Sequence, residues 1–282
     1  MEFQWYPGHM TKALRQMKED IKLIDLVIEL VDARIPLASR NPDIDSLASG
    51  RGRVLVLGKS DLADPGETEK WISFFSKQDI YAVAMDSRDK KSMKALRTQI
   101  DKASEKKRER DRKKGIKNRP VRALVAGIPN IGKSTLINTL AGRASAKTGN
   151  KPGVTKGKQW IRLGGDIELL DTPGLLWPKF EDKEVGFLLA SVGTINEDIL
   201  PREEMAIELY HRLAVKYPGR ITERYGIKED LGDAEVLTNI ALKRGFLLKD
   251  SEPDIVRASR LFLDEVRGGM LGRISLEEIK NE

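Results

Sequence analysis

The sequence predicts an α/β domain with a mostly parallel sheet, followed by a small all-α domain. In the first part of the chain, short apolar runs that end at Gly, Asp or Ser alternate with helical segments, a pattern typical of buried parallel strands. After about residue 178 no comparable apolar run occurs, and helical patterns continue to the end. We therefore expect one domain over 1–178 and a helical domain over 179–282.

The individual elements follow from hydrophobic spacing and turn residues. An amphipathic helix is expected over 11–23, and the expected parallel strands are 26–31, 53–57, 80–84 and 121–126. Residues 159–163 and 166–171 flank Gly164-Gly165, which predicts a hairpin and one antiparallel strand. In the second domain, helices begin at Pro201, near Val236 and at Pro253, and each ends at a glycine-containing turn.

Composition restricts the class of protein. The chain has 282 residues, of which 40% are apolar and 33% are charged, so it can bury a sizeable core. No apolar run is long enough for a transmembrane helix, and no secretory signal is visible. With no Cys and two His, disulfides are excluded and a zinc site is disfavoured. We expect a cytoplasmic protein without membrane attachment, and a monomer.

The net charge of +7 is concentrated in one segment. Residues 102–119 contain ten Lys or Arg against three Asp or Glu, which equals the excess of the whole chain. This basic linker within the first domain is either a solvated helix or loop, or an electrostatic contact to a polyanion.

The segment from Gly127 to Ser134 matches the phosphate-loop pattern Gly-x-x-x-x-Gly-Lys-Ser. It follows the strand 121–126 directly and precedes a helix start at 135–140, which is the context this motif needs. Lys133 is expected to reach the β- and γ-phosphates and to act in catalysis, and Ser134 to hold Mg²⁺. The expected phosphate-binding positions are Asn130, Ile131, Gly132, Lys133, Ser134 and Thr135.

A second motif, Asp171-Thr-Pro-Gly174, follows an apolar strand. A carboxylate at that strand end is placed to hold Mg²⁺, and the Gly174 N–H can reach the γ-phosphate. Between the two motifs lies Pro152-Gly-Val-Thr155. A Thr155 ligand to Mg²⁺ there predicts an order–disorder switch that responds to the γ-phosphate.

The base-reading residues are expected upstream, in Gly58-Lys59-Ser60-Asp61. The Asp61 carboxylate can accept both N1–H and the exocyclic N–H of guanine, whereas adenine would leave it unpaired at a cost of ~1–3 kcal/mol. The Lys59 stem can cover the base plane, and Asp86-Ser87 takes the place of the second base-contacting loop. These motifs precede the phosphate loop, whereas in an ordinary GTPase they follow it.

This order resembles that of circularly permuted GTPases. Together with Trp5-Tyr-Pro-Gly-His-Met10, Asp32-Ala-Arg-Ile-Pro36, Arg40-Asn-Pro42 and Leu176-Trp-Pro178, it makes the sequence similar to the bacterial ribosome biogenesis GTPase A family. The resemblance implies a circularly permuted P-loop GTPase domain that binds GTP and GDP. It also implies a role in late assembly of the large (50S) ribosomal subunit, with the precursor particle and its rRNA as partners.

The chain departs from the family pattern at Gly58, where the base-reading motif normally begins with Asn. That amide contacts the base and ties its loop to the phosphate loop. Gly58 therefore predicts guanine binding weaker by ~1–3 kcal/mol, since one hydrogen-bonding group is lost. Asp61 remains, so the preference for guanine should survive.

Hydrolysis needs a group that orients water. Leu175 stands where Ras-like enzymes place a Gln. The resemblance implies a catalytic role for His9, and the alternative is a turn histidine held by backbone. Asn130 is similar to the residue that holds K⁺ in potassium-activated GTPases, and the alternative is a turn-forming Asn. We expect slow hydrolysis by the protein alone and stimulation by the ribosomal subunit.

The helical domain is expected to contact RNA phosphates, because basic residues recur along it. They are Arg212, Lys216, Arg220, Arg224, Lys243, Arg244, Arg257, Arg260 and Arg267. The chain runs from Gly174 into this domain, which links nucleotide state to docking on rRNA. The alternative is a guanine-nucleotide-dependent RNA- or protein-binding scaffold with negligible turnover. A membrane-bound signalling GTPase is disfavoured, because the chain offers no lipidation site.

Overall fold

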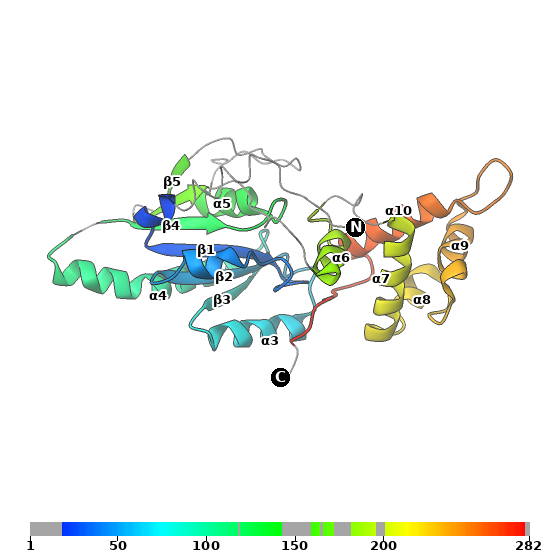
Figure 1. Ribbon diagram of the computed structural model, residues 1–282, viewed down its shortest axis with the longest axis horizontal. Helices are drawn as coiled ribbons and strands as arrows, with labels where there is room; N and C mark the ends of the chain where they lie inside the picture. Colours follow the sequence, from blue (N-terminus) through cyan, green and yellow to red (C-terminus); the bar gives the residue numbers. More distant parts are fainter. Residues whose placement is uncertain are drawn as a thin grey trace. The chain divides into compact units, whose positions relative to one another are not determined.

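The computed structural model describes residues 19–117, 119–142, 159–163, 166–171, 182–195 and 201–279. They form two compact units, of which the first is α/β and the second is helical (Figure 1). The second unit is Asp182–Leu276, and the residues from Glu277 onward group with the first unit. The expected boundary after residue 178 lies outside the described residues, and the expected helical domain differs from the observed unit at its C-terminal end.

The first unit is built on a six-stranded sheet. Its strands are β1 (Leu26–Asp32), β2 (Gly52–Gly58), β3 (Tyr81–Met85), β4 (Val121–Ala126), β5 (Gln159–Leu163) and β6 (Ile167–Asp171). The order is β3-β2-β1-β4-β6-β5, and β5 alone is antiparallel to its neighbour. The predicted α/β fold with a mostly parallel sheet and an antiparallel hairpin strand is confirmed. The turn at Gly164-Gly165 lies outside the described residues.

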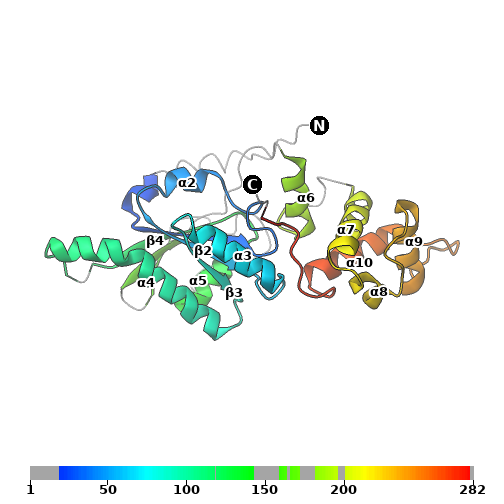
Figure 2. The same cartoon turned by 90° about the horizontal axis from the view of Figure 1, so that it is seen from below.

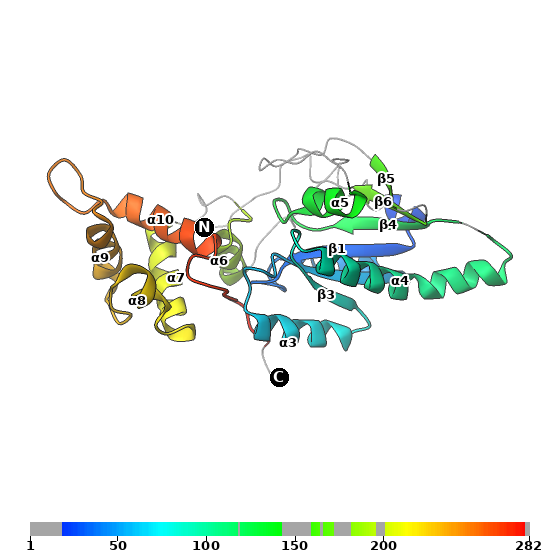
Figure 3. The ribbon, with the colours of Figure 1, turned by 180° about the vertical axis from the view of Figure 1, so that it is seen from behind.

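Burial explains why these apolar runs are strands. All seven residues of β1 are buried, as expected for a central parallel strand covered on both faces. The helix α2 (Asp43–Leu47) packs through Ile44 into the cluster that contains Val27 of β1. The helix α3 (Pro65–Ser76) packs through Trp71 and Phe75 into the cluster that contains Val31. The helix α4 (Lys90–Lys113) packs along β2 and β3, and α5 (Lys133–Ala141) along β4, β5 and β6 (Figure 3). Of the helix expected over 11–23, only its end is described, as residues 19–20 and the 3₁₀ turn η1 (Ile21–Leu23).

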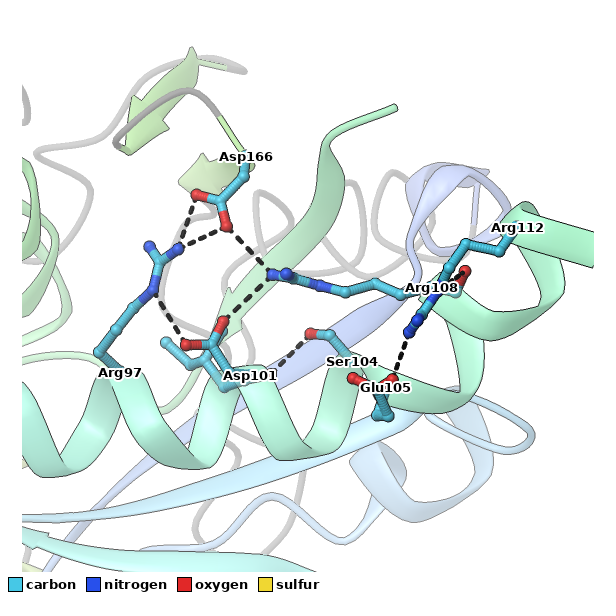
Figure 4. A network of polar contacts seen from close by, with 8 residues as sticks. Arg97, Asp101, Ser104, Glu105, Arg108, Arg112 and Asp166 are labelled. Atoms are coloured by element: carbon cyan, nitrogen blue, oxygen red, sulfur yellow. Dashed lines mark hydrogen bonds and ion pairs between the residues drawn. The ribbon is translucent and has the colours of Figure 1, made fainter. Parts of the chain in front are cut away.

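The basic segment 102–119 is largely helical, since α4 continues to Lys113. Its charges are partly paired within the fold (Figure 4). Arg108 Nη2 donates to Asp101 Oδ1 and to Asp166 Oδ2, both at 3.1 Å, and Arg112 pairs with Glu105. Lys107 is only 6% exposed, and its Nζ lies 2.5 Å from Asp111 Oδ2. Glu105 and Asp111 are already counted in the net charge of the segment, so of these pairings only that of Arg108 with Asp101 and Asp166 lowers the positive excess that remains for an external partner.

The second unit consists of α6 (Lys183–Ser191), α7 (Arg202–Lys216), α8 (Arg220–Tyr225), α9 (Asp233–Arg244) and α10 (Ile255–Arg267) (Figure 2). Met205, Leu209 and Leu213 of α7 are buried, as their four-residue spacing predicts. The described part of this unit has no strand beyond a single bridge between Leu247 and Pro253. None of the helices in the described ranges combines the length and apolar character that a membrane span requires.

Candidate functional site

The base loop (58–61) and the phosphate loop (127–132) lie at the carboxyl edge of the parallel strands. The base loop ends β2 and the phosphate loop follows β4, and both strands are neighbours of β1. The chain order reverses across β1, which makes this a topological switch point of the kind where α/β sheets bind ligands. The end of β1 therefore lies between the two loops.

Close backbone packing shapes the phosphate loop. Gly127 has φ 153°, and a Cβ there would lie 2.7 Å from the Leu30 carbonyl oxygen, so only glycine fits. Gly132, with φ 105°, caps the N-terminus of α5. Lys133 is 8% exposed, and its Nζ donates to the carbonyl oxygens of Gly127 (3.1 Å) and Ile128 (2.8 Å). The lysine thus crosses the loop from the helix that follows it.

The other predicted phosphate-binding residues lie in the same loop and in the first turn of α5. Asn130 is exposed with φ 57°, a left-handed conformation that Asn tolerates better than most residues. Ile131 is 2% exposed and anchors the loop to the core. Ser134 and Thr135 lie in the first turn of α5, where backbone N–H groups lack intrahelical partners and attract anions.

Of the residues predicted to hold Mg²⁺, Ser134 and Asp171 belong to elements that meet at the same edge. Asp171 ends β6 and pairs in register with Val125 of β4, just before the phosphate loop. A serine hydroxyl and a carboxylate suit Mg²⁺, which typically takes one or two carboxylates together with substrate phosphates. The donor types of Ser134 and Asp171 therefore fit this ion. His9, Thr155 and Gly174 lie outside the described residues.

The base loop is tied to the loop that follows β3. Ser60 N donates to the Met85 carbonyl oxygen at 3.2 Å. The Asp61 carboxylate pairs with Arg88, whose Nε also donates to Asp86 Oδ1 at 3.1 Å. The structure thus brings Asp61 and Asp86 together, and Ser87 lies exposed between Asp86 and Arg88. Arg88 was missed by sequence analysis, although it directly follows the predicted Asp86-Ser87.

A buried ion pair supports the base loop from β1. Arg34 Nε and Nη2 donate to Asp32 Oδ1 (2.9 Å) and Oδ2 (2.8 Å), and the two residues are at most 1% exposed. Lys59, with φ 54°, places its Nζ 3.1 Å from Asp32 Oδ2. Burial alone would raise the pKa of Asp32, but the charges of Arg34 and Lys59 outweigh it and hold that pKa well below its usual value. Asp32 therefore stays ionised and holds Lys59 in place.

Gly58, which stands where the family pattern has Asn, faces a leucine. A Cβ at Gly58 would lie 2.9 Å from Leu30 Cδ1 and 3.3 Å from the Val31 carbonyl oxygen. Leu30 is 3% exposed. The space beside this backbone position is thus already filled by an apolar side chain. Sequence analysis singled out Gly58 but had no signal for its partner on β1.

The C-terminal segment supports the loop after Arg34. The Glu277 carboxylate accepts from Leu37 N (2.6 Å) and Ala38 N (3.0 Å), and Glu277 N donates to the Arg34 carbonyl oxygen (3.3 Å). Ile279 packs against the cluster that contains Trp71 and Phe75. These contacts explain why the chain end groups with the first unit.

The chain is similar to known proteins in sequence and in fold. A family model described as 50S ribosome-binding GTPase matches residues 122–201. The chain is 44% identical to the ribosome biogenesis GTPase A of Priestia megaterium, over 99% of this chain and 97% of that protein. It is 33% identical to the ribosome biogenesis GTPase A of Thermotoga maritima, over 97% and 93%. The crystal structure of GNP-bound YlqF from T. maritima matches with a TM-score of 0.70 and 30% identity, covering 96% of this chain and 100% of that one.

Proposed function

Because this chain belongs to the ribosome biogenesis GTPase A family, we propose that it acts in late assembly of the large (50S) ribosomal subunit, with its nucleotide state controlling docking on rRNA. The chain is a GTPase of ribosome biogenesis with a P-loop. The proposal concerns the particle on which it acts, the residues that bind GTP and the coupling between hydrolysis and docking.

The placement of the base loop and the phosphate loop on either side of β1 is the observation that supports the proposed site. One GTP can extend from Asp61, which accepts the guanine N–H groups, to the first turn of α5, which receives the phosphates. Lys133 then exchanges its two loop carbonyls for phosphate oxygens and offsets their charge. Ser134, Asp171 and Thr155 are the proposed holders of Mg²⁺, which supplies charge neutralisation at the β- and γ-phosphates.

His9 and Asn130 remain the proposed helpers of hydrolysis. Leu175 has no polar side-chain atom to orient water, so another group is needed. A neutral histidine can accept a proton from water. The exposed, left-handed Asn130 stands in the phosphate loop, where a K⁺ held by its amide would offset developing charge.

The helical unit offers fewer free cations than its sequence suggested. Arg212 pairs with Glu184 and Glu208, and Arg224 pairs with Glu265. Arg267 donates to the carbonyl oxygen of Ala190. We propose that RNA phosphates are contacted instead by exposed cations at the end of α4 and on the helical unit, namely Lys106, Arg110, Lys113, Lys114, Lys117, Lys243, Arg257 and Arg260.

The order of the segments along the chain supports the proposed coupling between nucleotide state and docking on rRNA. Asp171 at the Mg²⁺ edge is joined to Asp182, the first residue of the helical unit, by residues 172–181. A change at the γ-phosphate can thus be passed along a short length of chain to the proposed RNA-binding unit.

The test is GTP turnover with and without large-subunit precursor particles, repeated across salt concentrations. We expect stimulation that weakens steeply as salt rises, because phosphate contacts release counterions. Lys113→Glu/Lys117→Glu should lower the stimulation and its salt slope, whereas the matched control Lys77→Glu, on the exposed end of α3, should not. Unchanged turnover with particles would overturn the proposal, and nucleotide-dependent docking without turnover would favour the scaffold alternative.

A further inference from the structure

We propose that Leu30 is the positioning residue that joins the base loop to the phosphate loop in this chain, in place of an asparagine side chain at position 58. Guanine is then held without a side-chain amide donor from position 58 to its acceptor edge. This inference rests on the proposed GTP site and deepens it, since it names how the base is read.

Leu30 lies against glycines of both loops. One methyl group, Cδ1, is 2.9 Å from where a Cβ of Gly58 would be, and the other, Cδ2, is 4.0 Å from where a Cβ of Gly132 would be. Its carbonyl oxygen is 2.7 Å from the corresponding point at Gly127. With 3% of its surface exposed, the side chain fills the space between the loops. The two loops are therefore connected by apolar packing, whereas an asparagine side chain at position 58 would connect them by hydrogen bonds.

The packing also closes position 58 to a larger side chain. Any Cβ at Gly58 forces Leu30 Cδ1 to move, and the Val31 carbonyl oxygen at 3.3 Å limits how far the new side chain can turn away. An asparagine introduced alone thus meets leucine methyl groups. Gly58→Asn on its own should therefore not restore the missing contact, and removal of the leucine branch is needed to make room.

The chemical consequence concerns the two edges of guanine. Its donors N1–H and N2–H₂ can be read by the Asp61 carboxylate, whereas its acceptors O6 and N7 need a donor. Position 58 then supplies no side-chain donor to N7, and the neighbouring Arg88 is held by Asp86, to which its Nε donates at 3.1 Å. A nucleotide whose N7 is replaced by carbon should then bind as well as GDP itself.

The experiment is calorimetric titration of the full-length chain with GDP, 7-deaza-GDP and ADP. We expect equal affinity for GDP and 7-deaza-GDP and a clear preference for both over ADP. A loss of 5-fold or more with 7-deaza-GDP, while ADP stays weak, would overturn this inference and leave the guanine site intact. Equal binding of ADP and GDP would instead overturn the proposed site.

A double-mutant cycle tests the role of Leu30 directly. Leu30→Ala should weaken the binding of GDP and of 7-deaza-GDP equally, because the base loop and the phosphate loop lose the side chain that packs between them. Leu30→Ala/Gly58→Asn should recover GDP binding and discriminate against 7-deaza-GDP by about 2- to 10-fold, the range for one neutral hydrogen bond. Additive effects of the two substitutions, with no new discrimination, would show that Leu30 and position 58 do not share this space.

Discussion

Replacing Arg34 by methionine should destabilise the first unit strongly. The substitution keeps a long side chain but removes the guanidinium that makes two side-chain hydrogen bonds to Asp32, at 2.8 and 2.9 Å. Asp32 is fully buried, and its carboxylate then keeps Lys59 Nζ and the backbone N–H of residue 34, both 3.1 Å away, but no guanidinium. An uncompensated buried charge typically costs about 3–5 kcal/mol. Because Lys59 remains, we expect the free energy of unfolding to fall by about 3 kcal/mol.

The assay is denaturant unfolding of the full chain followed by tryptophan fluorescence. All four tryptophans, at positions 5, 71, 160 and 177, precede Asp182, so the signal reports on the first unit. Trp71 is fully buried in the same cluster as Ala33, next to the ion pair. The matched control is Asp32→Asn/Arg34→Met, which removes the charge as well and should recover most of the loss. A loss below about 1 kcal/mol for Arg34→Met, or an equal loss in both variants, would refute this reasoning.

The pH dependence of stability gives a second measure of the Asp32–Arg34 ion pair. The folded-state pKa of Asp32 is lowered, so its contribution to stability is present above the unfolded pKa of about 3.9 and is lost as the pH falls toward the folded value. In Arg34→Met the buried carboxyl should instead take up a proton at higher pH. The stability difference between wild type and Arg34→Met should thus narrow as the pH is lowered, and a constant difference between pH 7 and 3 would contradict the assignment.

Three further predictions concern nucleotide binding and turnover. Arg88→Gln should tighten GDP binding by up to about 5-fold, because guanine then no longer has to displace the exposed Arg88 side chain from Asp61. Calorimetry would contradict this if the affinity fell, and Arg88→Lys is the control. GTP turnover should be faster in K⁺ than in Na⁺, and the Asn130→Ala variant should lose that difference. The His9→Ala variant should show lower turnover with ribosomal particles, without weaker binding of GDP. Equal rates in the two salts, or full stimulation of His9→Ala, would remove the corresponding residue from the proposed mechanism.

The strands and several helices were predictable because their signals are local. The expected strand 26–31 is observed as β1 over Leu26–Asp32, and the glycine and proline stops of α7 and α9 fall where expected. The positions of the two loops were also predictable, because Lys133 and Asp61 belong to motifs within a few residues of a strand end, and the role of these loops in binding GTP stays a prediction. The contact between Leu30 and Gly58 was not, because it depends on how two strands lie beside each other.

The partners of the arginines in the helical unit could not be predicted from the sequence either. Arg224 pairs with Glu265, 41 residues along the chain, and no spacing rule predicts such a partner. Their sequence pattern was interpreted as an RNA-binding surface, whereas several of these side chains stabilise the unit itself. The partners of the charges in 102–119 could not be predicted either, because Asp166, which directly precedes β6, lies beside α4 only in the folded chain.

The return of the chain end to the first unit has a practical consequence for dissecting this protein. A fragment that stops before Asp182 lacks Glu277, so the amides of Leu37 and Ala38 lose the acceptor they have in the intact chain. It also lacks Ile279, which leaves part of the Trp71 cluster uncovered. The helical unit is in this respect an insertion into the α/β unit. A fragment meant to preserve the α/β unit must therefore carry residues 277–282 as well as those before Asp182.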